Sequence, residues 1–284
     1  MILRRFTLAV LTLITLSIYF FVSAPAPLPD DTAVNAQIPV EKMFEILNDE
    51  NKAVRSIWSK EIVGKGKEVG LKFEEHWKVP STEAGPLPAL FLRETAKVLE
   101  LDPTPLSLFL GSDFPIASSN KFDGHQKKSL QSIRHTGKPE FFYNEDLKTH
   151  SAMFADVAVA QACVDCHNKH PDSPKTDWKL NDIMGATTWS YPKSKVTSDE
   201  IMQNVAALRR GFKTAYMDYL RKVESFKNKP EIGEKWPTDG FYLPSLEVFM
   251  KKIDQEVSGN TLDGILTLIS KSEKDNSKKK GASL

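Results

Sequence analysis

Both cysteines of this 284-residue chain lie in one short motif, Cys163-Val164-Asp165-Cys166-His167. Two thiols three residues apart fall on one helical turn, so each can add to a vinyl group at one edge of a single porphyrin. The imidazole that follows can then ligate the iron. The motif therefore predicts one covalently attached haem c, with Cys163 and Cys166 as thioether anchors and His167 as the proximal iron ligand.

Three other interpretations use the same residues. A redox dithiol is expected at the start of a helix in a βαβ unit, and the surrounding pattern does not suggest one. A zinc site would need a fourth ligand, which His170 could supply. A disulfide closing so short a loop would contribute little stability. The N-terminal segment favours haem, because this attachment chemistry requires export.

That segment begins with a basic pair followed by an apolar run over residues 6–22. This is the pattern of an export signal, and it is long enough to span the roughly 30 Å hydrocarbon core of a bilayer. Pro25 directly follows the nearest cleavage site, so we expect residues 1–24 to be an uncleaved signal anchor rather than a removed signal peptide. Residues 25–38, rich in Pro, Ala and Asp, then form a linker, and the rest lies in the periplasm, anchored to the inner membrane.

The composition is that of a folded globular protein, with 40% hydrophobic and 26% charged residues. A net charge of +1 gives no reason to expect nucleic acid as a partner. Phosphate loops, nucleophile elbows and further metal motifs are not found. We therefore do not expect an enzyme, and haem peroxidase-type activity is the minority alternative.

Apolar residues recur at helical spacing from Val40 to Ile62 and predict a long first helix. Segments rich in branched and aromatic residues predict strands. Because helices and strands mix without a regular βαβ repeat, the fold class is predicted as α+β with an antiparallel sheet. The other predicted elements are helices at 89–99 and 123–135 and strands at 106–110, 140–143 and 183–191.

The pattern changes after Pro192, where a capping box at Thr197 to Glu200 opens a near-heptad of apolar residues. A coiled-coil dimer is one interpretation; an amphipathic helix folded back on the domain is preferred, since the pattern lasts under four heptads. Two shorter helices, 244–256 and 261–271, and a disordered tail follow. The predicted regions are thus a haem domain (39–195), a helical extension (196–270) and a tail (271–284).

Three blocks of sequence, at residues 84–94, 111–120 and 163–192, resemble a bacterial family of periplasmic PAS-like c-type haem domains, long catalogued as a domain of unknown function. The resemblance covers about residues 40–192. It implies an antiparallel PAS-like sheet flanked by helices, with the haem between the sheet and the long N-terminal helix. It also implies sensing or electron transfer, without an assigned catalytic activity.

The sixth iron ligand decides between these functions, because a methionine raises the potential whereas an open site binds small ligands. Some family members use a thiolate, but this chain has no third cysteine. Met43, on the apolar face of the first helix, and Met153, shortly before the attachment motif, are the candidates in the sequence. His150 is a further candidate, and an open or water-ligated iron is the alternative.

Several polar and aromatic residues near the motif are predicted to contact the haem or the loop covering it. His170 suits outer hydrogen bonding or a propionate. The other predicted contacts are Arg93, Lys175 and Lys179 to propionates, Asn168 capping the attachment turn, and Asp177 and Trp178 in the covering loop.

The sequence as a whole favours a membrane-anchored monohaem protein that senses redox state or a diatomic gas and signals through an unidentified periplasmic partner. The alternative is a periplasmic carrier that delivers electrons to a redox partner.

Overall fold

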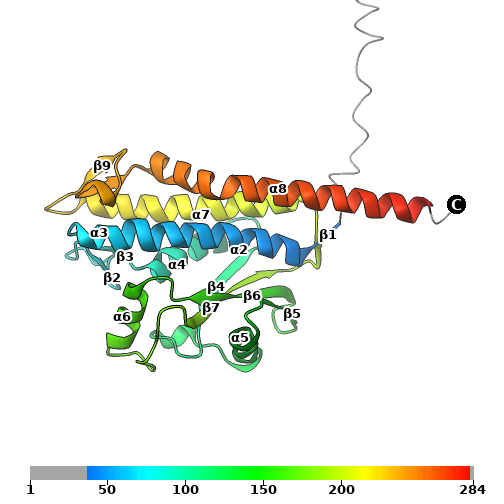
Figure 1. The fold of residues 1–284 in the computed structure, drawn as a ribbon, viewed down its shortest axis with the longest axis horizontal. Helices are drawn as coiled ribbons and strands as arrows, with labels where there is room; N and C mark the ends of the chain where they lie inside the picture. Colours follow the sequence, from blue (N-terminus) through cyan, green and yellow to red (C-terminus); the bar gives the residue numbers. More distant parts are fainter. Residues whose placement is uncertain (1–36, 282–284) are drawn as a thin grey trace, which may run out of the picture. The chain divides into compact units, whose positions relative to one another are not determined.

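The computed structural model describes residues 37–281, which belong to one compact unit (Figure 1). The predicted signal anchor and most of the predicted linker lie outside the described residues. Within residues 37–281, no helix combines the length and the apolar character needed to cross a bilayer.

A four-stranded antiparallel sheet forms the middle of the unit, with the strand order β4-β7-β6-β5. Its register places Trp189 opposite both Leu108 and Ala152. Three of the strands match predicted segments, which confirms a mixed fold with an antiparallel sheet. The strands are β4 (Ser107–Gly111), β5 (Glu140–Asn144), β6 (Thr149–Val157) and β7 (Ile183–Tyr191).

Strand β6 was not predicted from the sequence, and the burial of the strand explains why. Four consecutive residues of this strand, from Ser151 to Phe154, are buried. Both faces of the strand are covered, so the polar and apolar residues do not alternate as they do in a half-exposed strand.

The two faces of the sheet pack on different helices (Figure 1). On one face Ala152 and Trp189 join the main core with Phe44 of α2 (Val40–Ser56). On the other face Met153 packs in a small cluster with α5 (Gly124–Thr136). The sheet is therefore the middle layer between α2 and α5.

Helix α2 continues directly into an eight-residue π-helix, η1 (Ile57–Gly64), and then into α3 (Lys65–Glu68). π-helical turns are rare and occur often at functional sites. In η1 the Trp58 ring is fully buried and stacks on Phe91 with 4.3 Å between ring centroids. Phe91 belongs to α4 (Pro88–Glu100), which starts with proline at its first position, as predicted.

Two further helices form an outer layer against α2 and α4 (Figure 1). Helix α7 (Ser198–Glu224) starts at the predicted capping box, in which Thr197 and Glu200 exchange hydrogen bonds of 3.2 and 2.9 Å. Its apolar face is buried within the chain, as the folded-back interpretation expects. Tyr216 of α7 stacks on Phe249 of α8 (Leu246–Gly281) with 4.0 Å between centroids. The helical extension thus shares one core with the preceding domain.

Helix α8 is one helix where two shorter ones and a disordered tail were expected. A glycine inside a helix costs about 1 kcal/mol but does not end it by itself. Ile253, Val257 and Ile265 keep helical spacing on both sides of Gly259, and all three are buried in the main core.

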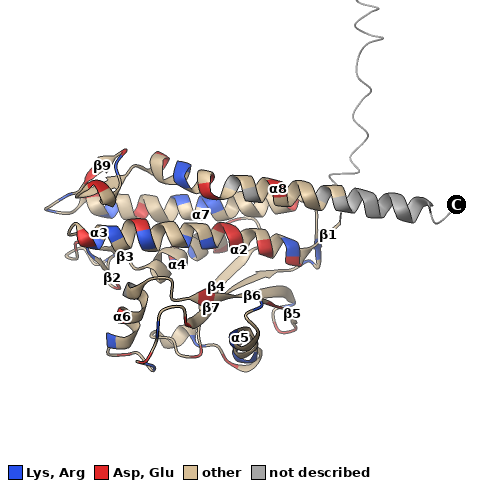
Figure 2. Cartoon of the chain, in the orientation of Figure 1, with Lys and Arg blue, Asp and Glu red and all other residues tan. Residues whose placement is uncertain are grey.

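The short elements and the charges complete the unit. Acidic and basic residues alternate along α2 (Figure 2). The short pairs are β1 (Ile38–Pro39) with β8 (Lys195–Val196), β2 (Phe73–Glu74) with β3 (Gly85–Pro86), and β9 (Glu231–Gly233) with β10 (Tyr242–Pro244); single 3₁₀ turns are η2 (Ser118–Asn120) and η3 (Pro237–Asp239).

Candidate functional site

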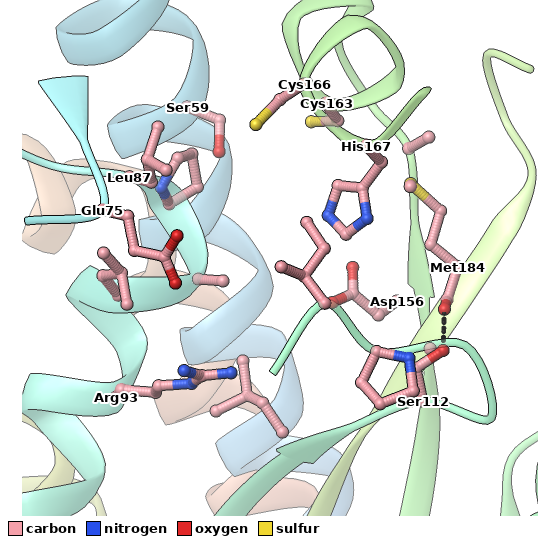
Figure 3. Close-up of a pocket in the computed structure, with 18 of the residues that line it drawn as sticks. Ser59, Glu75, Leu87, Arg93, Ser112, Asp156, Cys163, Cys166, His167 and Met184 are labelled. Atoms are coloured by element: carbon pink, nitrogen blue, oxygen red, sulfur yellow. Dashed lines mark hydrogen bonds between the residues drawn. The ribbon is translucent and has the colours of Figure 1, made fainter. Parts of the chain in front are cut away.

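The cysteine motif lies on a short helix, α6 (Gln161–Lys169), between β6 and β7. Cys163 and Cys166 are free thiols, and their sulfur atoms lie together at one end of a cavity with the His167 ring beside them (Figure 3). The cavity measures about 510 Å³, within the range of small-molecule and cofactor sites. The three residues predicted to hold a haem therefore meet at one opening.

The cavity is bounded by two walls of different origin. One wall comes from α6 and the adjoining ends of β6 and β7. The facing wall comes from η1, α4 and the segment between them. It combines apolar residues such as Val63 and Leu87 with polar ones, among them Ser59, Glu75 and His76. Ser59 is 4% exposed and comes from the π-helix. The widened turn thus puts Trp58 in the core and Ser59 at the cavity.

His167 has a buried ring nitrogen, Nδ1, with no hydrogen-bond partner. Burial lowers the pKa of His167, and the nearby Asp156 carboxylate opposes this shift. The neutral imidazole is the form that ligates a metal. Burial likewise raises the pKa of Cys166, so its side chain remains a thiol. Burial thus favours the uncharged form of both groups.

Arg93 of α4 lines the cavity at the end away from the two sulfur atoms (Figure 3). Its Nε is buried without a hydrogen-bond partner. Burial lowers the pKa of Arg93, and the charge of Glu75 partly offsets this. A second cavity-lining donor, Nδ2 of Asn120, is also buried and unpartnered. The cavity therefore offers unsatisfied donors suited to an anionic group.

Asn120 was missed by the sequence analysis, although it ends one of the three family-like blocks. Glu75 and His76 also line the cavity and were not singled out from the sequence. Ser59 and Asp156 were not singled out either. These residues come from separate elements, so no local spacing connects them with the cysteine motif.

The methionines predicted as sixth ligands do not line the cavity. Met43 is fully buried in the main core, and Met153 is fully buried in the cluster beside α5. His150 lies against Tyr143, with ring centroids 5.0 Å apart, and also lies outside the cavity lining. Met184 does line the cavity, but it lies on the same side as His167 (Figure 3).

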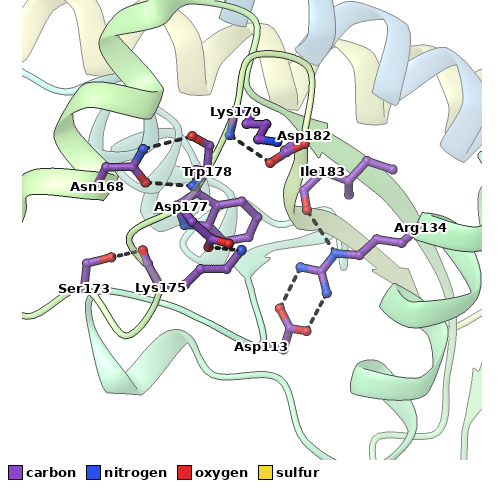
Figure 4. A network of polar contacts seen from close by, with 10 residues as sticks. All are labelled: Asp113, Arg134, Asn168, Ser173, Lys175, Asp177, Trp178, Lys179, Asp182 and Ile183. Atoms are coloured by element: carbon purple, nitrogen blue, oxygen red, sulfur yellow. Dashed lines mark hydrogen bonds and ion pairs between the residues drawn. The ribbon is translucent and has the colours of Figure 1, made fainter.

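The residues after the motif mostly hold a loop in place (Figure 4). The Asn168 side chain exchanges two hydrogen bonds of 2.9 Å with the backbone of Trp178. Lys175 pairs with Asp177 and lies 4.7 Å from the centroid of the Trp178 ring. The backbone N–H of Lys179 donates to Asp182 at 2.8 Å. None of these six residues lines the cavity, so Lys175 and Lys179 are not brought to it and Asn168 and Trp178 act on the loop.

His170 does line the cavity, and its Nε2 lies 3.2 Å from a carboxylate oxygen of Glu75. This contact joins the end of α6 to the segment after β2. The predicted role of His170 in outer hydrogen bonding is consistent with this position, where it joins the two walls at the edge of the cavity.

A partly buried ion pair fixes the loop that follows β4. Arg134 of α5 donates to both carboxylate oxygens of Asp113, one at 2.7 Å, and to the carbonyl oxygen of Ile183 at 3.0 Å (Figure 4). Burial alone would raise the pKa of Asp113, but the hydrogen bonds and charge of Arg134 hold it below its ordinary value. The loop supplies Pro115 and Ile116 to the cavity wall, so the pair stabilises the site.

Among residues 37–281, no three His, Cys, Asp or Glu side chains are grouped so as to hold a metal ion directly. The zinc alternative therefore gains no support from the described residues. A haem iron needs only one or two side chains, because the porphyrin supplies the other ligands.

Comparison with known proteins gives one match. The model of the Tll0287-like family matches residues 33–192, close to the range over which the sequence resembled a known family. No curated protein and no solved structure shows detectable similarity to the chain.

Proposed function

This chain belongs to the Tll0287-like family, and we propose that it is an exported monohaem c-type protein whose haem domain is PAS-like. Its function would be to sense redox state or a diatomic gas and to signal through a periplasmic partner. The proposal depends mainly on one observation: the two sulfur atoms and the His167 imidazole meet in one cavity of about 510 Å³.

The positions of the thiols and of the buried cation in the cavity fit a haem. The vinyl groups and the two propionates of a haem lie on opposite edges of the macrocycle. The cavity has thiols at one end and the unpartnered guanidinium of Arg93 at the other (Figure 3). Charge-assisted bonds from Arg to carboxylates are among the strong hydrogen bonds in proteins.

The protein side of the mechanism follows from these positions. Cys163 and Cys166 would hold the haem through thioethers, and His167 would supply an imidazole to the iron. Arg93 would neutralise a carboxylate, and the aliphatic side chains of Val63, Leu87 and Leu90 would limit the access of water. The bound haem supplies an iron that changes oxidation state and takes small ligands.

A sensor is favoured over a carrier because the methionines considered as sixth ligands are buried elsewhere. The wall facing His167 combines aliphatic residues and Ser59 with polar side chains such as Glu75 and His76, and none of its lining residues is a methionine. The same wall includes η1, which is continuous with α2, and α2 packs on α7 and α8. A displacement of η1 at the cavity would thus pass through α2 to the outer helices α7 and α8.

The test is to express the protein in cells with haem-attachment machinery and to record a pyridine haemochrome spectrum of the denatured protein. We expect one covalent haem per chain, and none in the Cys163→Ala/Cys166→Ala double variant. Haem that is absent or extractable from the wild-type protein would refute the proposal.

Ligand binding separates the two functions. Fast binding of carbon monoxide to the ferrous protein supports the sensor, whereas a six-coordinate low-spin haem unchanged by carbon monoxide would point to the carrier. Arg93→Gln should lower the midpoint potential, because a positive charge near the haem favours the reduced state. Lys97→Gln removes the same charge from the exposed side of α4 and should leave the potential nearly unchanged.

A further inference from the structure

Asp156 lies at the base of the cavity, beneath the ring of His167 (Figure 3). It is the last regularly paired residue of β6 before a β-bulge, with Gly185 opposite it on β7. Bulges often redirect a side chain beside a functional site. The Asp156 side chain is 18% exposed, so its carboxylate is largely withdrawn from water.

Arg55, which also lines the cavity, holds this carboxylate. Its guanidinium forms an ion pair with Asp156, and its side chain is also only 18% exposed. Arg55 stands in the last turn of α2, directly before the π-helix. The pair therefore connects the strand beside His167 to the helix that carries the opposite wall.

One ring nitrogen of His167, Nδ1, is buried and makes no hydrogen bond in the structure. A histidine that ligates a metal through one nitrogen almost always donates its other N–H to a carboxylate, a carbonyl or water. The charges that act on His167 come from Asp156, His170 and Arg55, and Asp156 has the largest effect and is the one carboxylate among them.

We propose that Asp156, oriented by Arg55, accepts a hydrogen bond from Nδ1–H of His167 and so sets how strongly the imidazole donates to the iron. The inference rests on the proposed function, since it concerns the ligand of an attached haem. A stronger hydrogen bond gives the imidazole more anionic character and favours ferric iron. Asp156 is therefore a positioning residue that lowers the reduction potential. Arg55 weakens this effect, because its guanidinium withdraws charge from the carboxylate.

The two members of the pair should then act in opposite directions. Asp156→Asn weakens the acceptor and should raise the midpoint potential. Arg55→Gln leaves the carboxylate without its cation and should lower the potential. Glu75→Gln is the control for charge alone, because it removes a carboxylate from the cavity lining that does not act on His167. It should also raise the potential, by loss of a negative charge, but without changing the hydrogen bond to Nδ1.

A second readout separates the hydrogen bond from general electrostatics. In the cyanide adduct of the ferric protein the sixth ligand is the same in every variant, so the largest EPR g value reports the donor strength of the histidine. We expect this value to rise in Asp156→Asn, to fall in Arg55→Gln and to stay constant in Glu75→Gln.

Haem content is measured first, by the pyridine haemochrome assay. A wild-type protein without covalent haem refutes the proposed function. A wild-type protein with haem whose variants show no opposed shifts, or whose Glu75→Gln control shifts the g value as much as Asp156→Asn, refutes this inference alone. If Asp156→Asn does not fold, Arg55→Gln decides: a lower potential and g value support the inference, and unchanged values overturn it.

Discussion

Glu50 offers a direct test of whether the outer helices are part of the same folding unit as the cavity. Its side chain is completely buried in α2. The carboxylate accepts hydrogen bonds from Arg209 of α7, at 2.6 and 2.9 Å, and from Thr261 of α8, at 2.7 Å. One carboxylate thus ties three helices together, and replacing Glu50 with Gln removes its charge while nearly preserving its shape.

The magnitude follows from the burial of the partners. Removing one member of a fully buried ion pair costs about 3–5 kcal/mol. The Arg209 side chain is 25% exposed and keeps a second carboxylate, Asp254, at 3.0 Å. We therefore expect the low end, a loss of about 3 kcal/mol of unfolding free energy. For a chain of this size, this corresponds to a melting temperature lower by roughly 6–12 °C.

The assay is urea and thermal unfolding followed by circular dichroism. Glu45→Gln is the control on the same helix, since the Glu45 side chain is 43% exposed and pairs with Lys42. Exposed pairs contribute about 0–1 kcal/mol, so this variant should unfold nearly as the wild type does. Equal effects in the two variants would refute the reasoning, as would a separate early transition in which the outer helices unfold alone.

Two further substitutions test the packing around the cavity. A Cβ at Gly185 would lie 2.4 Å from the carbonyl oxygen of Gly111, so Gly185→Ala should cost about 1–3 kcal/mol of unfolding free energy. The control is Gly233→Ala, whose Cβ meets no atom within 4 Å and which should be nearly neutral. Similar urea midpoints for the two variants would contradict the packing. Asp113→Asn should cost about 2 kcal/mol at pH 7, because it breaks the ion pair with Arg134. Since the folded-state pKa of Asp113 lies below its ordinary value of 3.8, this stabilisation is complete above that value and is lost as the pH falls further. Urea unfolding at neutral and acidic pH should therefore show the difference from wild type narrowing in acid, and a constant difference would contradict it.

The secondary structure was predictable wherever it depends on local pattern. The helix after Pro88, the capping box at Thr197 and three strands were found because caps, proline positions and branched residues act over a few residues. Strand β6 was missed because neighbours cover both of its faces. The continuity of α8 through Gly259 depends on packing against α2, which the local sequence does not reveal.

The sequence by itself predicted the chemistry proposed for Cys163, Cys166 and His167 and placed them together, because one helical turn is enough to present all three on the same side. Only the tertiary structure decided what faces them. Arg93 and Asp156 reach the cavity from a helix and a strand far apart in the chain, through the packing of α4 and the register of β6 on β7. The same packing buries both predicted methionine ligands in the core. Neighbouring side chains on a strand or helix point in different directions, and only the packed layers decide which of them face the cavity.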